Sequence, residues 1–345
     1  ERMLRQGREV TLQSLQNTPT DLQALRRVAH ISRLLMDDGI QQCALSIALA
    51  LGGPDGQTEQ MLGQLLAKKP RFPQIALTEQ VFRHILAAGD VANCGTSGDE
   101  HTASLIAANP GTVLMLGDTA YPTTTPSALN CYRSSWGAFL SRTWATVGDN
   151  DYPDGYAQNA VPFWSYFAGR TGAAGKGWYS FDQAGWHVIG LNANCDKVGC
   201  GAGSEQERWL KADLAAHPTT CALVTFHEPY VSAGSHVGNS AMRPLVQDLY
   251  DAGVDLMLSG HNHDYERFAP VNPSGNSDPS RGIRQFVSGL GGFSGGSQFY
   301  WPSTIQYFHG TGQAVLRIDT TSTGYTWRVL AYGGSFSDSG SGSCH

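Results

Sequence analysis

The chain contains few charged residues and no long hydrophobic run. Charged residues make up 15% of its 345 residues, against about 25% in an ordinary soluble protein. Because Lys and Arg (23) do not outnumber Asp and Glu (29), the composition lacks the basic excess typical of a nucleic-acid-binding protein. The longest apolar candidate, residues 43–51, is far shorter than the ~18 residues of a membrane-spanning helix. We therefore expect a soluble globular protein with no nucleic-acid-binding patch and no membrane span.

Several catalytic signatures are missing as well. The sequence has no GxxxxGK[ST] phosphate-binding loop, no CxxC zinc pattern and no evident Ser nucleophile with His and Asp partners. The letters HNHD at 261–264 resemble the start of the HxHxDH zinc motif, but Tyr265 and Glu266 occupy the next two positions. These observations argue against a nucleotide-binding P-loop protein, a serine hydrolase and an HxHxDH-type zinc hydrolase.

The seven cysteines, with the low charge and 41 glycines, favour a secreted or periplasmic protein with about three disulfides. Cys195 and Cys200 lie so close in sequence that one bridge can close their loop. Two weaker pairings are expected from positions beside strand signals or near the chain end: Cys94–Cys131 and Cys221–Cys344. Cys43 would remain unpaired. The alternative is a cytosolic protein with reduced thiols, and export would require a leader already removed, since no signal peptide is visible at residue 1.

The composition of the sequence and the spacing of its apolar residues change near residue 80. Residues 1–78 are rich in Gln and Leu, with apolar residues at helical spacing, and predict a small helical segment. Residues 79–345 show short apolar runs bounded by turn residues, which predict strands at 85–88, 113–116, 188–191, 222–226 and 256–259. Helices are predicted between them at 204–216 and 242–252. This alternation indicates a main domain of the α/β class.

Polar side chains follow several of these predicted strands. In order, the clusters are Gly89-Asp90, Gly117-Asp118 with Tyr121, GDND at 148–151, His227, and GHNH at 260–263. Each cluster alone is weak, because a Gly-Asp pair after a strand usually forms a turn. Together they would gather carboxylates and imidazoles at the carboxyl ends of the strands. Such ligands suit ions such as Mn, Fe and Zn, and a shared carboxylate would give a two-metal hydrolytic site.

At these residues the sequence resembles the calcineurin-like metallophosphoesterases, and within them the purple acid phosphatases. The family pattern is an Asp after the first strand, then GDxxY, GNH[D/E], VxxH and GHxH. The corresponding segments here are GDVA at 89–92, GDTAY at 117–121, GDND at 148–151, VTFH at 224–227 and GHNHDYER at 260–267. The resemblance covers about residues 80–345. It implies a two-sheet β-sandwich flanked by helices, preceded here by the small helical segment.

The resemblance also implies a metal-ligand set. The first metal would be held by Asp90, Tyr121 and His263, and the second by Asp149, His227 and His261. Asp118 would bridge the two. The expected cofactors are two metal ions, Fe with Zn, Mn or Fe.

The candidate catalytic residues beside these ligands are His236, Asn150 and Glu228. His236 stands where purple acid phosphatases place a histidine that contacts the substrate, although it can equally be a solvated loop residue. Asp99 and His101, after the first strand, are expected at the surface.

The chain departs from the family pattern at GDND. Asp149 replaces a metal-binding Asn and adds a negative charge, which should bind a divalent ion more tightly and repel an anionic phosphate. Asn150 replaces a His and cannot protonate a leaving group, a loss that typically costs about 10²–10⁴ in rate. His236 or Glu228 would have to substitute for it.

Two functional hypotheses therefore remain open. The first is a secreted metallophosphoesterase, resembling acid phosphatases, that hydrolyses a small phosphate mono- or diester with a metal-bound hydroxide. The alternative is a catalytically impaired homologue that binds metal or phosphate. The sequence leaves open the natural substrate, the metals, the oligomeric state and the role of residues 1–78.

Overall fold

A computed structural model describes residues 83–152, 159–293 and 295–345 of the chain. These residues belong to one compact unit, Val81–His345. The helical segment predicted for residues 1–78 lies outside the described residues, as does Cys43.

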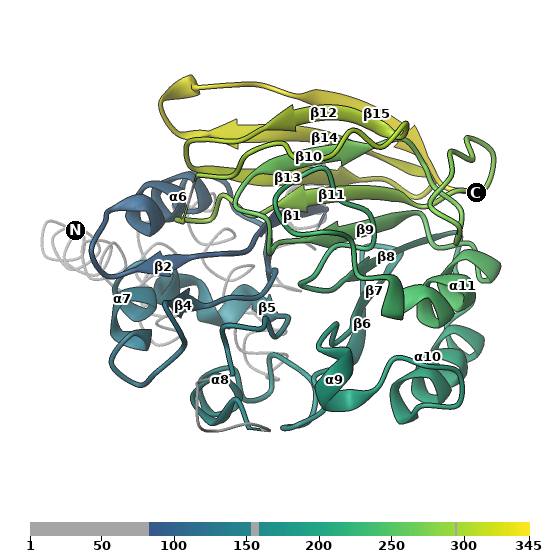
Figure 1. Cartoon of the computed structure of the whole chain (residues 1–345), viewed down its shortest axis with the longest axis horizontal. Helices are drawn as coiled ribbons and strands as arrows, with labels where there is room; N and C mark the ends of the chain where they lie inside the picture. Colours follow the sequence, from purple (N-terminus) through teal and green to yellow (C-terminus); the bar gives the residue numbers. More distant parts are fainter. Residues whose placement is uncertain (1–82, 153–158, 294) are drawn as a thin grey trace, which may run out of the picture. The chain divides into compact units, whose positions relative to one another are not determined.

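Two β-sheets form the framework of this unit (Figure 1). The six-stranded sheet has the order β15-β14-β13-β1-β3-β5. Its strands are β1 His84–Ala88, β3 Thr112–Met115, β5 Thr143–Ala145, β13 Ala314–Thr320, β14 Gly324–Ala331 and β15 Ser339–Ser343. The seven-stranded sheet has the order β12-β10-β11-β9-β8-β7-β6. Its strands are β6 Tyr179–Gln183, β7 Trp186–Gly190, β8 Cys221–Thr225, β9 Leu256–Ser259, β10 Tyr265–Phe268, β11 Arg284–Ser288 and β12 Ile305–His309.

Helices and a small ribbon complete the described part of the unit. The helices are α6 Gly98–Ala107, α7 Leu129–Ser134, α8 Val161–Tyr166, α9 Cys195–Val198, α10 Glu205–Ala216 and α11 Arg243–Asp251. The ribbon pairs β2 Ala92–Asn93 with β4 Ala120–Tyr121. Three short 3-10 helices span Trp136–Arg142, Ser240–Met242 and Tyr332–Gly334. None of the helices in the described ranges has the length and apolarity needed to cross a bilayer.

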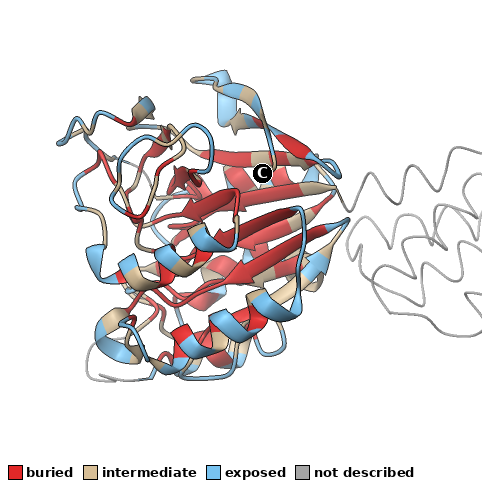
Figure 2. Ribbon diagram, turned by 90° about the vertical axis from the view of Figure 1, so that its right-hand side faces the viewer, coloured by how far each residue is buried: buried red, intermediate tan, exposed pale blue. Residues whose placement is uncertain are grey.

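The core has three layers because most strands are apolar on both faces. In β1, Ile85 and Ala87 pack between the two sheets, whereas Leu86 and Ala88 pack on the opposite side with α6 and α7. On the outer face of the other sheet, apolar residues of β7, β8 and β9 pack against α10 and α11. Figure 2 shows the strands buried along most of their length and the helices exposed on their outer sides. The predicted two-sheet sandwich flanked by helices is confirmed.

The predicted strands and helices of the first two thirds of this unit are confirmed. The five apolar runs form β1, β3, β7, β8 and β9, and the two helical stretches form α10 and α11. Helix α10 begins where predicted because the Ser204 side chain accepts a hydrogen bond from the Glu207 backbone N–H at 3.2 Å, a typical N-cap. The three expected disulfides, Cys94–Cys131, Cys195–Cys200 and Cys221–Cys344, are present.

Asp99 differs from its expected surface position. Its side chain lies in the first turn of α6 and is 1% exposed, where it accepts a hydrogen bond from the Ser135 hydroxyl. Burial raises the pKa of Asp99 to about 6, because removal from water disfavours the charged carboxylate.

This buried carboxyl makes stability depend on pH. Because the pKa of Asp99 is higher in the folded chain, its stabilising contribution is complete below about pH 4 and is lost as pH rises through 6. We expect Asp99→Asn, which cannot ionise, to gain stability relative to the parent between pH 4.5 and pH 8, by on the order of 1 kcal/mol. Thermal unfolding at the two pH values measures this. The exposed-site control Asp251→Asn should show no such gain, and an equal gain in both variants would contradict the explanation.

Candidate metal centre

The polar side chains singled out in the sequence come together at one end of the two sheets. Strands β1, β3 and β5 run parallel in one sheet, as do β7, β8, β9 and β11 in the other. The loops that follow these strands carry Asp90 after β1, Asp118 after β3, Asp149 after β5, His227 after β8, and His261 and His263 after β9. The carboxyl ends of parallel strands share one edge, where ligands bind in many α/β proteins.

Close approach between these loops explains the glycines before the acids. A Cβ at Gly148 would lie 2.0 Å from Asp118 Oδ1, and one at Gly117 would lie 2.3 Å from His227 Nδ1. The backbone also turns sharply at the acids themselves, with φ of 60° at Asp90 and 56° at Asp118. These angles lie in the left-handed region, which Asp tolerates better than most residues. The Gly-Asp pairs are turns, as their sequence suggests, and these turns direct carboxylates into the cluster.

One group of side chains surrounds the phenol of Tyr121. Its oxygen donates to Asp90 Oδ1 at 2.6 Å and lies 2.8 Å from Asp118 Oδ2. The same oxygen is 3.0 Å from His263 Nε2. The structure therefore brings together the three residues expected to hold the first metal and the expected bridging carboxylate.

A second group surrounds His227 on the other side of Asp118. His227 Nε2 lies 3.2 Å from Asp118 Oδ1 and 3.0 Å from Asp149 Oδ1. His261 Nδ1 is 3.1 Å from the same Asp149 oxygen. The two oxygens of Asp118 thus face different groups, Oδ2 towards the phenol and Oδ1 towards His227. This carboxylate lies where a bridging ligand would have to be.

The orientation of His227 follows from a backbone contact. Its Nδ1 lies 2.7 Å from the carbonyl oxygen of Leu116, the residue after β3. With the Nδ1 proton donated to that carbonyl, Nε2 is the nitrogen that faces the carboxylates of Asp118 and Asp149 and the one that could bind a metal. A second hydrogen bond of this kind is common for metal-binding histidines, since it fixes the tautomer and the ring position.

The pKa shifts in the cluster indicate that additional positive charge would stabilise it. Burial raises the pKa of Asp90 well above its ordinary range. Burial acts to lower the pKa of His227, but Asp118 and Asp149 outweigh it and raise that pKa well above its usual range. Burial acts to raise the pKa of the Asp149 carboxyl, but the nearby imidazoles of His227 and His261 outweigh it and hold that pKa below normal. These pKa shifts are caused by burial together with the close approach of acids and imidazoles.

The donor set fits divalent or trivalent ions of the Mn, Fe and Zn type. Two sets of residues could each hold an ion: Asp90–Asp118–His227 and Asp149–His227–His261. Within each set, the possible ligand atoms lie within 4.8 Å of one another. His227 Nε2 is buried and has no hydrogen-bond partner of good geometry. Carboxylate oxygens and imidazole nitrogens are the ligands that such ions prefer. The cluster is therefore a candidate metal centre.

In the structure, Asn150 of the GDND segment contacts the Asp118 carboxylate, whereas its position in the motif suggests a catalytic group. The Asn150 side chain donates to Asp118 Oδ2 at 2.5 Å, and its backbone N–H donates to Asp118 Oδ1 at 2.9 Å. Asn150 therefore holds the central carboxylate. Its amide contributes hydrogen bonds but no proton for transfer.

Asp151 is a residue that the sequence reasoning missed. It is fully buried and accepts hydrogen bonds from the backbone N–H groups of Asp118, Thr119 and Gly148 at 3.1, 3.0 and 2.8 Å. The Thr124 hydroxyl donates to it at 2.6 Å. Asp151 thus joins the loops after β3 and β5. The sequence signal that could have found it is its position as the last acid of the motif, which corresponds to [D/E] in GNH[D/E]. That position was overlooked because the residue has no evident metal to bind.

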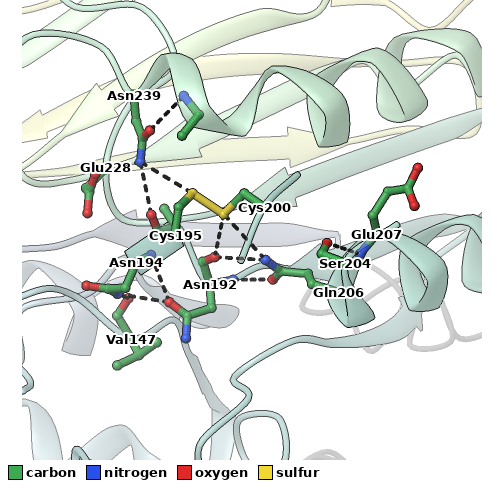
Figure 3. The surroundings of a disulfide bond; sticks show 12 residues. Val147, Asn192, Asn194, Cys195, Cys200, Ser204, Gln206, Glu207, Glu228 and Asn239 are labelled. Atoms are coloured by element: carbon green, nitrogen blue, oxygen red, sulfur yellow. Dashed lines mark hydrogen bonds between the residues drawn. A yellow bond between two sulfur atoms is a disulfide. The ribbon is translucent and has the colours of Figure 1, made fainter. Parts of the chain in front are cut away.

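The remaining candidates, His236 and Glu228, lie beside the second group. The His236 ring is exposed, and its centroid is 4.4 Å from that of His261. The Asn262 side chain, between the two histidines of GHNH, accepts from the His236 backbone N–H at 2.8 Å. Glu228 accepts a hydrogen bond from Asn239 Nδ2 at 2.6 Å, and burial raises its pKa. Figure 3 shows Asn239 beside Glu228 and Cys195 of the Cys195–Cys200 disulfide.

A two-sheet sandwich with carboxylates and imidazoles gathered at its strand ends fits a metal-dependent phosphoesterase. Residues 72–265 match the family of calcineurin-like phosphoesterases, and the chain belongs to that family. It is 26% identical over 281 residues to purple acid phosphatase 18 of Arabidopsis thaliana, covering 68% of this chain and 63% of the relative. It is 32% identical over 179 residues to purple acid phosphatase 1 of Ipomoea batatas, covering 46% and 37%. The chain thus spans less than two thirds of the length of these relatives.

Solved structures show the same fold. A purple acid phosphatase, PPD1, from yellow lupin (Lupinus luteus) seeds superimposes with a TM-score of 0.62 at 17% identity, over 75% of this chain and 53% of the lupin chain. GAP50 of Plasmodium, described as the anchor in the inner membrane complex, superimposes with a TM-score of 0.57 at 16% identity, over 74% and 87%. At these identities the likeness concerns the fold alone.

The central position of Asp118 predicts how metal content responds to mutation. We expect Asp118→Asn to lower metal occupancy by more than one ion per chain, because its two oxygens face both groups. His263→Ala, in the first group only, should lower it by about one ion. Elemental analysis of the purified variants measures this, with His101→Ala as a control outside the cluster. Metal content of Asp118→Asn equal to that of the parent would contradict a bridging role.

Proposed function

We propose that the chain is a binuclear-metal hydrolase of phosphate esters. The observation that carries the proposal is the buried Asp118 carboxylate, whose two oxygens face two separate sets of metal-ligand side chains. Family membership supports the chemistry, and the relatives are named as acid phosphatases. The substrate would be a small phosphate mono- or diester.

The proposed ligands follow the two groups. Asp90, Tyr121 and His263 would hold one ion, and Asp149, His227 and His261 the other, with Asp118 shared. We propose iron in the first site, with zinc, manganese or iron in the second. Two such ions would neutralise charge on the phosphoryl oxygens and make a water molecule acidic enough to attack phosphorus.

The chain's own residues would position the ester and handle its protons. His236 is exposed beside His261, so its ring can donate to a phosphoryl or leaving-group oxygen from the solvent side. Burial raises the pKa of Glu228, which shifts its carboxyl towards the protonated form from which it could donate a proton. Asn150 would keep the Asp118 carboxylate in place through its two hydrogen bonds.

The alternative is a homologue that binds metal or phosphate and turns over poorly. It is favoured by the pair Asp149 and Asn150, which puts an extra carboxylate beside His227 and leaves no proton donor at position 150. GAP50 has the same fold and is described as an anchor, so the fold by itself does not decide between the two functions. Three disulfides support a secreted or periplasmic location, which we propose for either function.

An assay of four proteins separates the two functions. The parent, Asn150→His, Asp149→Asn and the double variant are compared for hydrolysis of an aryl phosphate and its diester, before and after metal removal by a chelator. We expect the parent to hydrolyse ester only when metal is bound. Asn150→His should raise kcat, by roughly tenfold or more with poor leaving groups, since an imidazolium can donate a proton and an amide cannot. Asp149→Asn should act in the same direction, because it removes a charge that repels phosphate.

Asp196→Asn, which removes an exposed carboxylate elsewhere, is the matched control for charge and should leave kcat unchanged. The hydrolase proposal would be wrong if the metal-loaded parent had no activity and neither substitution, nor both together, gave any. That result would favour the metal- or phosphate-binding homologue.

Tyr121 predicts a colour. Burial and the neighbouring carboxylates Asp90 and Asp118 raise the pKa of its phenol well above 10, so only a strongly acidic ion such as Fe(III) would remove the proton. We expect the iron-loaded protein to have a broad visible absorption band from phenolate-to-iron charge transfer, and Tyr121→Phe to lose it at unchanged iron content. Spectra and iron analysis of both proteins measure this. A colourless iron-loaded parent, or a band that survives in Tyr121→Phe, would show that the phenol is a packing group.

A further inference from the structure

A second cluster of imidazoles and carboxylates lies at the opposite end of the strands. His187 is the second residue of β7 and therefore lies near the amino end of that strand, whereas the candidate metal centre follows the carboxyl ends. Asp213 is in α10, His217 caps that helix, and Asp182 is in the neighbouring strand β6. None of these residues contributes to the function proposed above.

The geometry of this cluster is compact. His187 Nε2 lies 2.9 Å from Asp213 Oδ2, and its Nδ1 lies 2.7 Å from Asp182 Oδ1. The His217 ring stacks on the His187 ring, with centroids 4.6 Å apart and planes 15° from parallel. One possible ligand atom from each of His187, Asp213 and His217 lies within 4.8 Å of the other two. His217 Nδ1 also lies 2.9 Å from the Asp213 backbone carbonyl oxygen, so the His217 ring would have to tilt out of the stack for its free nitrogen to face the same ion as His187 and Asp213.

A neutral His187 has one proton too few to donate to both of the carboxylates that face its ring nitrogens. A neutral imidazole has one N–H, but both ring nitrogens of His187 face carboxylate oxygens, and the side chain is 1% exposed. One of the two contacts therefore needs an extra cation, which is a proton or a metal ion. Burial acts to lower the pKa of His187, but Asp213 and Asp182 outweigh it and raise it, so the metal-free chain favours a proton in this place.

We propose that His187, Asp213 and His217 form a separate site for a divalent ion of the zinc type. The ion would take the place of the proton between His187 Nε2 and Asp213 Oδ2. Imidazole and carboxylate are common zinc ligands at bonds of about 2.0–2.2 Å. Tetrahedral geometry then needs ligand atoms roughly 3.3 Å apart, so the observed 2.9 Å between His187 and Asp213 has to widen by a few tenths of an ångström, and the exposed His217 ring, whose ligand atom lies within 4.8 Å of the other two, has to move towards them.

Three features of the surroundings suit such a site. Asp182 would accept the remaining Nδ1 proton of His187, which is the carboxylate–histidine–metal arrangement that fixes ring orientation. Asp213 and His217 are four residues apart at the end of α10, so their side chains lie on one face. The His217 side chain is 41% exposed, which leaves a path from solvent. Two carboxylates and two neutral imidazoles would balance the charge of a divalent ion.

A bound ion would fasten the end of α10 to the β6–β7 hairpin. Ser180 of β6 already donates to Asp213 Oδ1 at 2.6 Å, so the carboxylate is held in position before any ion arrives. We therefore infer a structural role for the ion.

The test counts zinc in the full-length protein. The parent, His217→Ala and His101→Ala are equilibrated with a small excess of zinc at pH 8, separated from free metal by gel filtration, and analysed for zinc per chain. We expect His217→Ala to hold one zinc fewer than the parent, and His101→Ala to match the parent. Zinc should also raise the Tm of the parent by more than that of His217→Ala, while phosphate ester hydrolysis stays the same in both.

The comparison is independent of how many ions the candidate metal centre binds, because that centre is intact in all three proteins. His217 is exposed, so its replacement by Ala should leave the fold intact, which thermal unfolding without zinc verifies. Equal zinc content in the parent and His217→Ala, or an equal loss in His101→Ala, would overturn the proposal.

Discussion

The folded chain buries several carboxylates at one place, and much of the local structure serves to make that possible. Asp90 and Asp118 are at most 1% exposed, and a buried charge without partners is costly. The backbone N–H of His261 donates to Asp90 Oδ2 at 2.8 Å, and Asn150 donates twice to Asp118. These donors come from loops after different strands. The same carboxylates that would bind metal therefore also tie the ends of the strands together.

The centre exists only where the two sheets are aligned. Asp118 and Asp149 follow strands of one sheet, and His227 follows a strand of the other, yet its ring touches both acids. The hydrogen bond between His227 Nδ1 and the Leu116 carbonyl oxygen crosses between the sheets at 2.7 Å. The apolar layer between the sheets fixes this alignment, because residues such as Leu114 of β3 and Leu223 of β8 pack in one core cluster. Packing far from the ligands thus sets the distances between them.

The two ends of the strands use the same side chains differently. At the carboxyl ends, imidazoles meet three acids, Asp90, Asp118 and Asp149, which the function proposed above assigns to two ions. At the amino end of β7, His187 is held between two acids and stacked on His217, which suits one ion with no place for substrate. The difference lies in how many loops converge: five at the first end, and one helix with one hairpin at the second.

The sequence alone predicted four of the five strands that precede the ligands (β1, β3, β8 and β9), the two main helices, the three disulfides and the family. It could do so because strand periodicity, turn glycines and motif spacing are local properties of the chain. It did not predict β5, β6 or the strands after β9, and β15 (Ser339–Ser343) consists only of Ser and Gly, which give no local strand signal. It also placed Asp99 at the surface, because nothing local reveals that Ser135 and the strand loops cover it.

Only the tertiary structure decided which side chains share protons and partners. That Asp118 faces both ligand groups, that Asn150 holds this carboxylate, and that Asp151 joins two loops through backbone N–H groups depend on contacts across some 30 residues of sequence or more. The cluster of His187, Asp213 and His217 had no motif at all, because its members come from a strand and a helix that meet only when α10 packs on the sheet. Residue types are fixed by sequence, but the distances that turn them into a site are set by long-range packing.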